Sequence, residues 1–218
     1  MSGGSPGNPP EKSPVRQESR PEPPHADLIV AVVQELLEAG GYDAVQLREV
    51  AARAHVSLAT IYRLFSSRDE LIVTALERWM GANSYAELAL PTEGESIYDG
   101  LMRGLRYVFE PWERNPRMLE AYHRARTGPG GRRLDRQGMQ TIEPNANALL
   151  ANADPEYVED ITLILKNLAY AVIGRFAAGN IDITAILPTL ERAVYRLTAD
   201  NETPATEARA HGTRPRAT

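Results

Sequence analysis

The segment that decides the fold reads LREVAARAHVSLATIYRLFSSRDEL and runs from Leu47 to Leu71. Its apolar residues recur three or four positions apart, which is helical spacing. The spacing predicts one short helix over residues 47–54, another over residues 58–65, and a longer helix that opens at Asp69. Two short helices joined by so few residues are typical of a helix-turn-helix.

The residues of the turn meet the steric demands of that motif. Ala51 and Ala54 are small enough for the two helices to cross closely. His55 stands where the chain needs a positive φ, which histidine tolerates better than most residues. Val56 can fill the crossing, and Ser57 can cap the second helix, so that its N-terminal amides face outward as an anion site. The alternative is an αα-hairpin inside a helical bundle, which would not need so many of these features together.

The rest of the chain continues in helical periodicity, and no convincing strand or internal repeat is present. We therefore expect an all-α fold of nine to ten helices. The further helices are expected from Asp27 to the stop at Gly40, from Ile97 to a break at Pro111, over 116–126, over 134–151 with an interruption near Pro144, over 161–178, and over 183–197 with Pro188 marking a kink or a late start.

Composition excludes several classes of protein. The 218 residues include no cysteine, which rules out disulfide scaffolds, cysteine zinc sites, iron–sulfur clusters and thiol nucleophiles. The formal net charge of −5 disfavours nucleic acid binding by the molecule as a whole. Residues 47–68, however, hold four arginines against one glutamate, which supplies positive charge locally.

The two ends of the chain are polar and rich in proline. We expect residues 1–26 to form a disordered arm and residues 200–218 a disordered tail, because neither can bury enough apolar surface to fold. No secretory leader and no membrane-spanning apolar run is present, so we expect a cytoplasmic protein. The folded part then divides into a helix-turn-helix domain over 27–68 and a larger helical domain over 69–199.

The segment from Leu47 to Leu71 resembles the TetR family of transcriptional repressors over about 25 ordered positions. Within that family, the segment YDAVQLR from Tyr42 and the segment that begins RNP at Arg114 look most like actinobacterial regulators of sterol and lipid catabolism. The resemblance implies an N-terminal three-helix DNA-binding domain and a C-terminal helical domain that binds a small molecule and pairs with a second copy. It further implies an inverted-repeat DNA operator as partner.

Carried over by position, the resemblance assigns the DNA contacts. The helix expected over residues 58–65 should enter the major groove. There, Arg63 can donate two hydrogen bonds to guanine, and Thr60 offers a hydroxyl and a methyl. Tyr62 and Arg68 are expected on phosphates. The full expected set is Gln46, Arg48, Ser57, Leu58, Ala59, Thr60, Tyr62, Arg63 and Arg68.

The C-terminal domain should hold a mainly apolar effector, hydrophobic or acyl-type. Candidate pocket residues combine large apolar surface with a few polar groups: Phe109, Trp112, Met118, Tyr122, Met139, Ile142, Asn167 and Tyr170. The seven arginines between Arg114 and Arg136 form either a solvated face or a portal for an acidic ligand head.

The last two apolar segments have more apolar surface than one buried stripe requires. We expect them to pair with their symmetry mates in a four-helix dimer interface. The expected interface residues are Ile161, Leu165, Leu168, Val172, Ile173, Phe176, Ile186, Leu190 and Val194.

Other functions remain open at this point. An enzyme or a lipid-carrying bundle would need a nucleophile or a convergent acid–base pair, and the sequence shows none. The four histidines lie far apart without helical spacing, so no metal site and no cofactor is expected. An activator, or a DNA binder that needs no ligand, would have the same fold.

Overall fold

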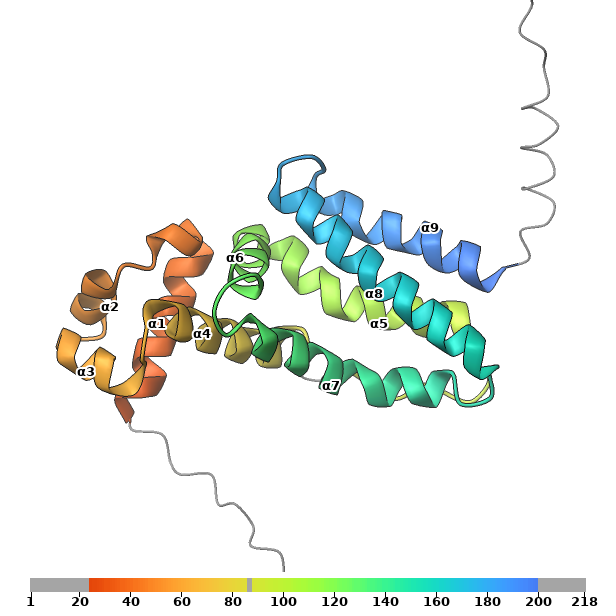
Figure 1. The fold of residues 1–218 in the computed structure, drawn as a ribbon, viewed down its shortest axis with the longest axis horizontal. Coiled ribbons are helices and arrows are strands. Elements are labelled where there is room, and N and C mark those ends of the chain that lie inside the picture. Colours follow the sequence, from red (N-terminus) through yellow and green to blue (C-terminus); the bar gives the residue numbers. More distant parts are fainter. Residues whose placement is uncertain (1–23, 86–87, 200–218) are drawn as a thin grey trace, which may run out of the picture.

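The computed structural model describes residues 24–85 and 88–199. Helices account for its regular structure, and no strand occurs in these residues. Figure 1 shows α1, α2 and α3 grouped as a head at one end, and α5, α7, α8 and α9 together as a body at the other, with α4 and α6 between them. The elements are α1 (Pro24–Gly40), η1 (Tyr42–Ala44), α2 (Leu47–Arg53), α3 (Leu58–Leu64), α4 (Arg68–Asn83), α5 (Ile97–Arg114), α6 (Pro116–Arg126), α7 (Gly131–Leu149), α8 (Pro155–Ala177), η2 (Ile183–Ala185) and α9 (Ile186–Thr198).

Four of the nine α-helices of the described residues begin where a side chain caps their first amides. Ser57, Ser67 and Ser96 each accept a hydrogen bond from the backbone N–H three residues later. Asp154 caps two amides of α8, so this helix begins at Pro155 rather than near Ile161. The first helix likewise begins at Pro24 instead of Asp27, which extends the DNA-binding domain by one turn.

The expected breaks at Pro111 and Pro144 do not occur, because α5 and α7 run through both prolines. A proline inside a helix costs about 3 kcal/mol. In α5 the neighbouring Val108 and Trp112 are buried at 9% and 3% exposure. Each such burial contributes about 1.5–3 kcal/mol, so tertiary packing offsets the local penalty.

One contiguous apolar core connects the head to the body. It begins between α1, α2 and α3, continues along α4 and α6, and ends between α8 and α9. The small residues Ala51 and Ala54 are buried at the helix crossing, at 8% and 1% exposure, as expected for the helix-turn-helix. Helices α4 and α6 contact both α1 and the helices of the body, so they connect the head to the body.

Candidate nucleic-acid interface and effector cavity

The turn between α2 and α3 has the geometry that its sequence predicted. His55 has a φ of 51°, and it is the only non-glycine residue with positive φ among the described residues. The N–H of Val56 donates to the carbonyl of Ala51 at 3.0 Å, which closes the turn. The Ser57 hydroxyl accepts from the N–H of Thr60 at 3.0 Å and lies 2.9 Å from the Thr60 hydroxyl. The start of α3 is therefore rigidly held.

The outer surface of α3 presents the expected mixture of groups. Ala59, Tyr62 and Arg63 are exposed, with Tyr62 at 58%, while Ile61 on the opposite side is buried in the head. Leu58 is half-buried and packs against the core, so it offers less surface than expected. An exposed tyrosine ring beside an arginine on a short capped helix suits contact with a DNA groove and its phosphates.

The arginines of the head divide into two kinds. Arg53 is paired with Glu49 across one helical turn, with 2.6 Å between Nε and Oε1. Arg48 and Arg63 are exposed and have no ion-pair partner within residues 24–85 and 88–199. Gln46, also exposed, donates from its side chain to the Asp43 carbonyl at 2.9 Å. Arg48 and Arg63 are therefore the arginines of this surface whose charges have no ion-pair partner within the described residues.

Arg68 has a structural role that the sequence did not predict. Its Nε donates to the Val45 carbonyl at 2.6 Å, and its guanidinium also donates to the Tyr42 carbonyl and stacks over the Tyr42 ring. These bonds hold η1 against the start of α4. The expected phosphate contact of Arg68 is corrected accordingly, because its donors face backbone carbonyls inside the head.

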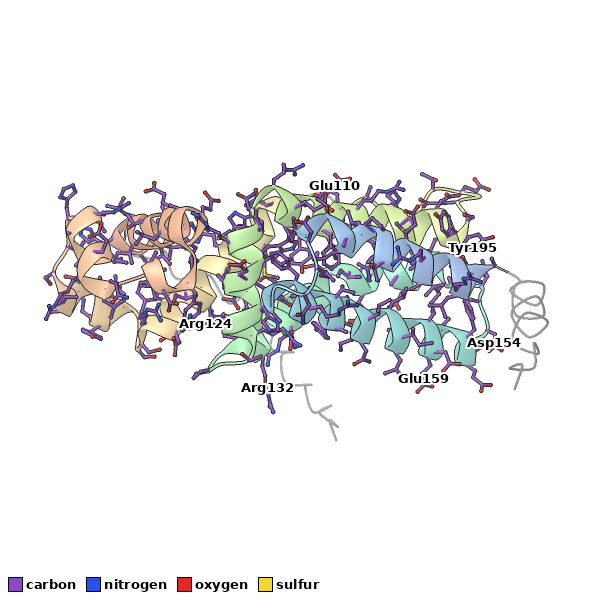
Figure 2. The ribbon with its side chains drawn as sticks, turned by 90° about the horizontal axis from the view of Figure 1, so that it is seen from above. Glu110, Arg124, Arg132, Asp154, Glu159 and Tyr195 are labelled. Carbon is purple, nitrogen blue, oxygen red and sulfur yellow. The ribbon has the colours of Figure 1, made fainter. Side chains whose placement is uncertain are left out.

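Several side chains fasten the head to α4 and α6. Arg124 donates to both carboxylate oxygens of Asp43 at 2.8 Å and stacks over Tyr42, and Figure 2 shows Arg124 on the side of α6 that faces the head. The hydrogen bonds from Arg124 hold the pKa of the Asp43 carboxyl below its usual value. On α4, Trp79 donates to Glu38 of α1 at 3.0 Å.

The basic stretch Arg114–Arg136 matches neither expected alternative as a whole. Arg124, Arg126 and Arg133 form ion pairs with acidic residues on other elements or the next turn, whereas Arg114, Arg117, Arg132 and Arg136 are exposed. None of the seven lines the cavity described next. The portal hypothesis for this stretch is therefore not supported, and part of it serves to join the helices.

The body contains a mainly apolar cavity of about 390 Å³ that is partly open to solvent. Its walls come from α5, α6, α7 and α8, with Tyr85 and Leu88 from the segment that follows α4. Six predicted residues line it: Phe109, Trp112, Tyr122, Met139, Ile142 and Tyr170. A cavity of this size, with a few polar groups among apolar ones, is typical of a site for a small molecule.

Two predicted pocket residues do not reach the cavity. Met118 is fully buried in the core between the head and the body. Asn167 is exposed on the outer side of α8, where its side chain donates to the Leu163 carbonyl of its own helix at 2.8 Å. The polar cavity residues that sequence reasoning missed are Tyr85, Asp135, Glu143, Asn145, Asn147, Thr162 and Lys166. They lie on α7, on α8 and in the segment after α4, and no single motif connects them.

An aromatic contact chain leads from the cavity toward the head. The Trp112 ring lies 5.5 Å from that of Tyr122 and 4.5 Å from that of Trp79, centroid to centroid. Trp112 and Tyr122 line the cavity, whereas Trp79 belongs to α4 and bonds to Glu38 of α1. Side chains of the cavity wall are thus linked by direct contacts to α1 of the head.

The expected dimer interface is corrected. Ile161, Val172, Ile173, Ile186, Leu190 and Val194 are buried inside one protomer, none more than 5% exposed. Leu165 lines the cavity, and Leu168 and Phe176 pack against the core. The reason is that α8 is apolar on several sides, and the fold turns the predicted side inward. The large apolar residues that remain exposed on α8 and α9 are Leu163, Ile164 and Tyr195.

The described part of the chain shows no grouping of acidic residues and histidines that could hold a metal ion. None of the helices in that part is both long enough and apolar enough to cross a membrane. Helix α3, capped by Ser57, and the mainly apolar cavity of the body define a helix-turn-helix head joined to a helical body with a pocket.

Comparison with known proteins gives the family. Residues 29–75 match the model described as bacterial regulatory proteins of the tetR family, and residues 94–197 match the tetracyclin repressor-like C-terminal domain. The chain therefore belongs to the TetR family of transcriptional regulators, which are DNA-binding proteins rather than enzymes. Members of this family bind DNA operators and small-molecule effectors, and they dimerise.

The relatives agree with this assignment. The chain is 40% identical over 90 residues to the HTH-type transcriptional repressor KstR of Mycolicibacterium smegmatis, and 36% identical over 86 residues to KstR of Mycobacterium tuberculosis. These matches cover 39% of this chain, and 42% and 39% of the respective relatives, so the chain matches about two fifths of their length.

Solved structures share the fold. A TetR transcriptional regulator from Rhodococcus sp. RHA1 superposes with a TM-score of 0.61 at 22% identity, covering 78% of this chain and 95% of the other. The fatty acid degradation regulator FadR from Bacillus halodurans superposes with a TM-score of 0.56 at 14% identity. The match covers 80% of this chain and 96% of the other.

Proposed function

We propose that this protein is a homodimeric, cytoplasmic transcriptional repressor that binds an inverted-repeat operator and leaves it when a small hydrophobic or acyl-type molecule occupies the cavity. The observation that carries the proposal is the outer surface of α3, where Tyr62 and Arg63 are exposed on a helix whose first turn is capped by Ser57. The KstR relatives, which are named as repressors, support the same reading.

The operator should be an inverted repeat because a two-fold dimer presents two copies of α3 in opposite directions. Recognition helices in such dimers lie one helical turn apart, about 34–36 Å. The exposed Leu163 and Ile164 on α8 and Tyr195 on α9 supply apolar surface for the pairing. This face lies on the body and leaves α3 open to DNA (Figure 1).

The effector would act by a shift in population. A molecule that binds better to one arrangement of the body favours that arrangement by its difference in affinity for the two. The chain Tyr122–Trp112–Trp79 and the bond from Trp79 to Glu38 offer a route by which this arrangement moves α1 and hence α3. A head spacing that no longer matches two half-sites lowers operator affinity.

The first step of the test selects the fragments of the source genome that the intact protein binds and retains. Fluorescence anisotropy on a selected duplex then compares Arg63→Ala and Tyr62→Phe with Arg114→Ala, an exposed arginine at the C-terminal end of α5 that serves as control. We expect Arg63→Ala to weaken operator binding by about 1–3 kcal/mol and the control to leave it unchanged. Equal binding by all three would contradict the proposed docking, and increased transcription on binding would show an activator instead.

A further inference from the structure

One end of the cavity is polar, and it is built from three tyrosines and an aspartate. Tyr85, Tyr122 and Tyr170 line the cavity together with Asp135 of α7. The Tyr170 hydroxyl donates to the Asp135 carboxylate at 3.1 Å. The hydroxyls of Tyr85 and Tyr122 make no hydrogen bond with any other residue of the described chain. Tyr122 is nevertheless only 8% exposed.

Such hydroxyls are expected to have a partner. Neither hydroxyl has a partner within the described residues, so each has a hydrogen bond to offer to water or to a ligand in the cavity. Both side chains face the cavity, where a ligand oxygen can accept their hydrogen bonds. Burial raises the pKa of both tyrosines, so the hydroxyls stay protonated and serve as donors at physiological pH.

The backbone makes room for one of these hydroxyls. Gly138 of α7 also lines the cavity, and a Cβ at this position would lie 3.1 Å from the Tyr85 hydroxyl. That separation is shorter than ordinary van der Waals contact. An alanine at position 138 would therefore push the hydroxyl away from its present place.

The charges around the cavity disfavour an anionic ligand. Its charged lining residues are Asp135, Glu143 and Lys166, which leaves one excess negative charge. Glu143 and Lys166 are exposed, whereas Asp135 stands at the tyrosine end. The nearest arginine there, Arg126, lies 3.8 Å from Asp135 and stacks over the Tyr170 ring, so its charge is already compensated. Because Asp135 and Arg126 offset each other's charge, this end offers an anion no unpaired cation.

We propose that the cavity binds an uncharged, mainly apolar molecule that carries a carbonyl or hydroxyl oxygen at one end, and that Tyr122 and Tyr85 hold this oxygen. The inference rests on the proposed function and narrows the effector class given there. The rest of the lining is mainly apolar, with Leu101, Leu105 and Ile161 among it, and accommodates the remainder of the molecule. The end of the cavity that would hold the oxygen lies beside Trp112, whose ring contacts Trp79 of α4.

Intrinsic fluorescence provides a direct test, because the only two tryptophans of the chain are Trp79 and Trp112. Binding of 1-decanol, 2-decanone, decanoate and decanoyl-CoA is measured by titration of the intact protein without DNA. We expect the affinity for the alcohol and for the ketone to be at least about tenfold higher than that for decanoate at pH values near 7. Tighter binding of decanoate or decanoyl-CoA, or no response to any of the four, would overturn the proposal.

Matched variants identify the donors. Tyr122→Phe and Tyr85→Phe each remove one hydroxyl and keep the ring, and each should raise the Kd for 2-decanone about threefold to tenfold while leaving that for decanoate unchanged. Tyr157→Phe is the control, since its hydroxyl bonds to the Leu197 carbonyl outside the cavity. If the two cavity variants bind 2-decanone as well as the wild type does, the proposal is refuted.

The two proposals can fail separately. If the protein retains no genomic fragment but binds the ketone through its tyrosines, the repressor function is refuted and the cavity assignment stands. If decanoate is the one compound of the four that releases a bound operator, the repressor function stands and the assignment of an uncharged ligand is refuted. Circular dichroism of each variant checks that the helices are intact.

Discussion

The exposed cations of the head lead to a quantitative prediction for the salt dependence of operator binding. Arg48 and Arg53 both lie on α2, but Arg53 is paired with Glu49 and Arg48 has no ion-pair partner among the described residues. Replacing Arg48 by glutamine should remove a phosphate contact. Replacing Arg53 by glutamine makes the same chemical change at a residue whose charge is already engaged.

The magnitude follows from counterion release. Each neutralised phosphate adds about 0.9 to the slope of log affinity against log salt concentration. A dimer carries two copies of Arg48, so Arg48→Gln should make the slope shallower by about 1.8. Between about 50 and 200 mM salt, the wild type should then lose about twelvefold more affinity than this variant. For Arg53→Gln we expect a change in slope below about 0.5.

Fluorescence anisotropy of a labelled operator duplex, titrated at several salt concentrations, measures both slopes. The unfolding midpoint in urea confirms that each variant is as stable as the wild type. Equal slopes for Arg48→Gln and wild type would refute the reasoning that an unpaired arginine on α2 reaches the DNA backbone. A larger effect of Arg53→Gln would show that its pair with Glu49 opens on the operator.

Three further outcomes follow from contacts within the protein. Arg68→Gln should lower the free energy of unfolding by about 2 kcal/mol, measured in urea, and leave the salt slope of operator binding unchanged, because Arg68 bonds to backbone carbonyls. Leu163→Glu should yield monomers in light scattering, whereas Leu90→Glu, at a loop residue of similar exposure, should leave the dimer intact; a dimeric Leu163→Glu would refute the α8 face. The pKa of Asp43 is lowered by Arg124, so this ion pair stabilises the fold above about pH 4 and is lost as the pH falls through the folded-state pKa. The difference in free energy of unfolding between wild type and Arg124→Gln should disappear over that pH range. A difference that persists at lower pH would contradict the assignment.

The helix-turn-helix could be predicted in detail because its requirements are local. The positive φ of His55, the cap from Ser57 and the small residues at the crossing each depend on neighbours within a few positions. Local conformational preference therefore identified the motif, its boundaries and the exposed residues of α3. Arg68 lies at the edge of the same motif but was misjudged, since its partners are more than twenty residues away.

Helix limits in the body were less predictable. The local penalty of Pro111 favours a break, but the burial of residues on both sides of it outweighs that penalty. The inward side of α8 was also ambiguous, because Ile161, Leu163, Ile164 and Leu165 are all apolar and periodicity cannot say which of them faces the core. Only packing against the other helices resolves that choice.

The sequence by itself determined the all-helical class, the DNA-binding motif and the aromatic residues that line much of the cavity. Tertiary structure decided which apolar side of α8 stays exposed, which arginines remain available to DNA, and that Tyr85, Tyr122, Tyr170 and Asp135 meet at one end of the cavity. The physical reason is distance along the chain. Caps, turns and periodicity involve neighbouring residues, whereas the polar end of the cavity is assembled from four segments that only the folded core brings together.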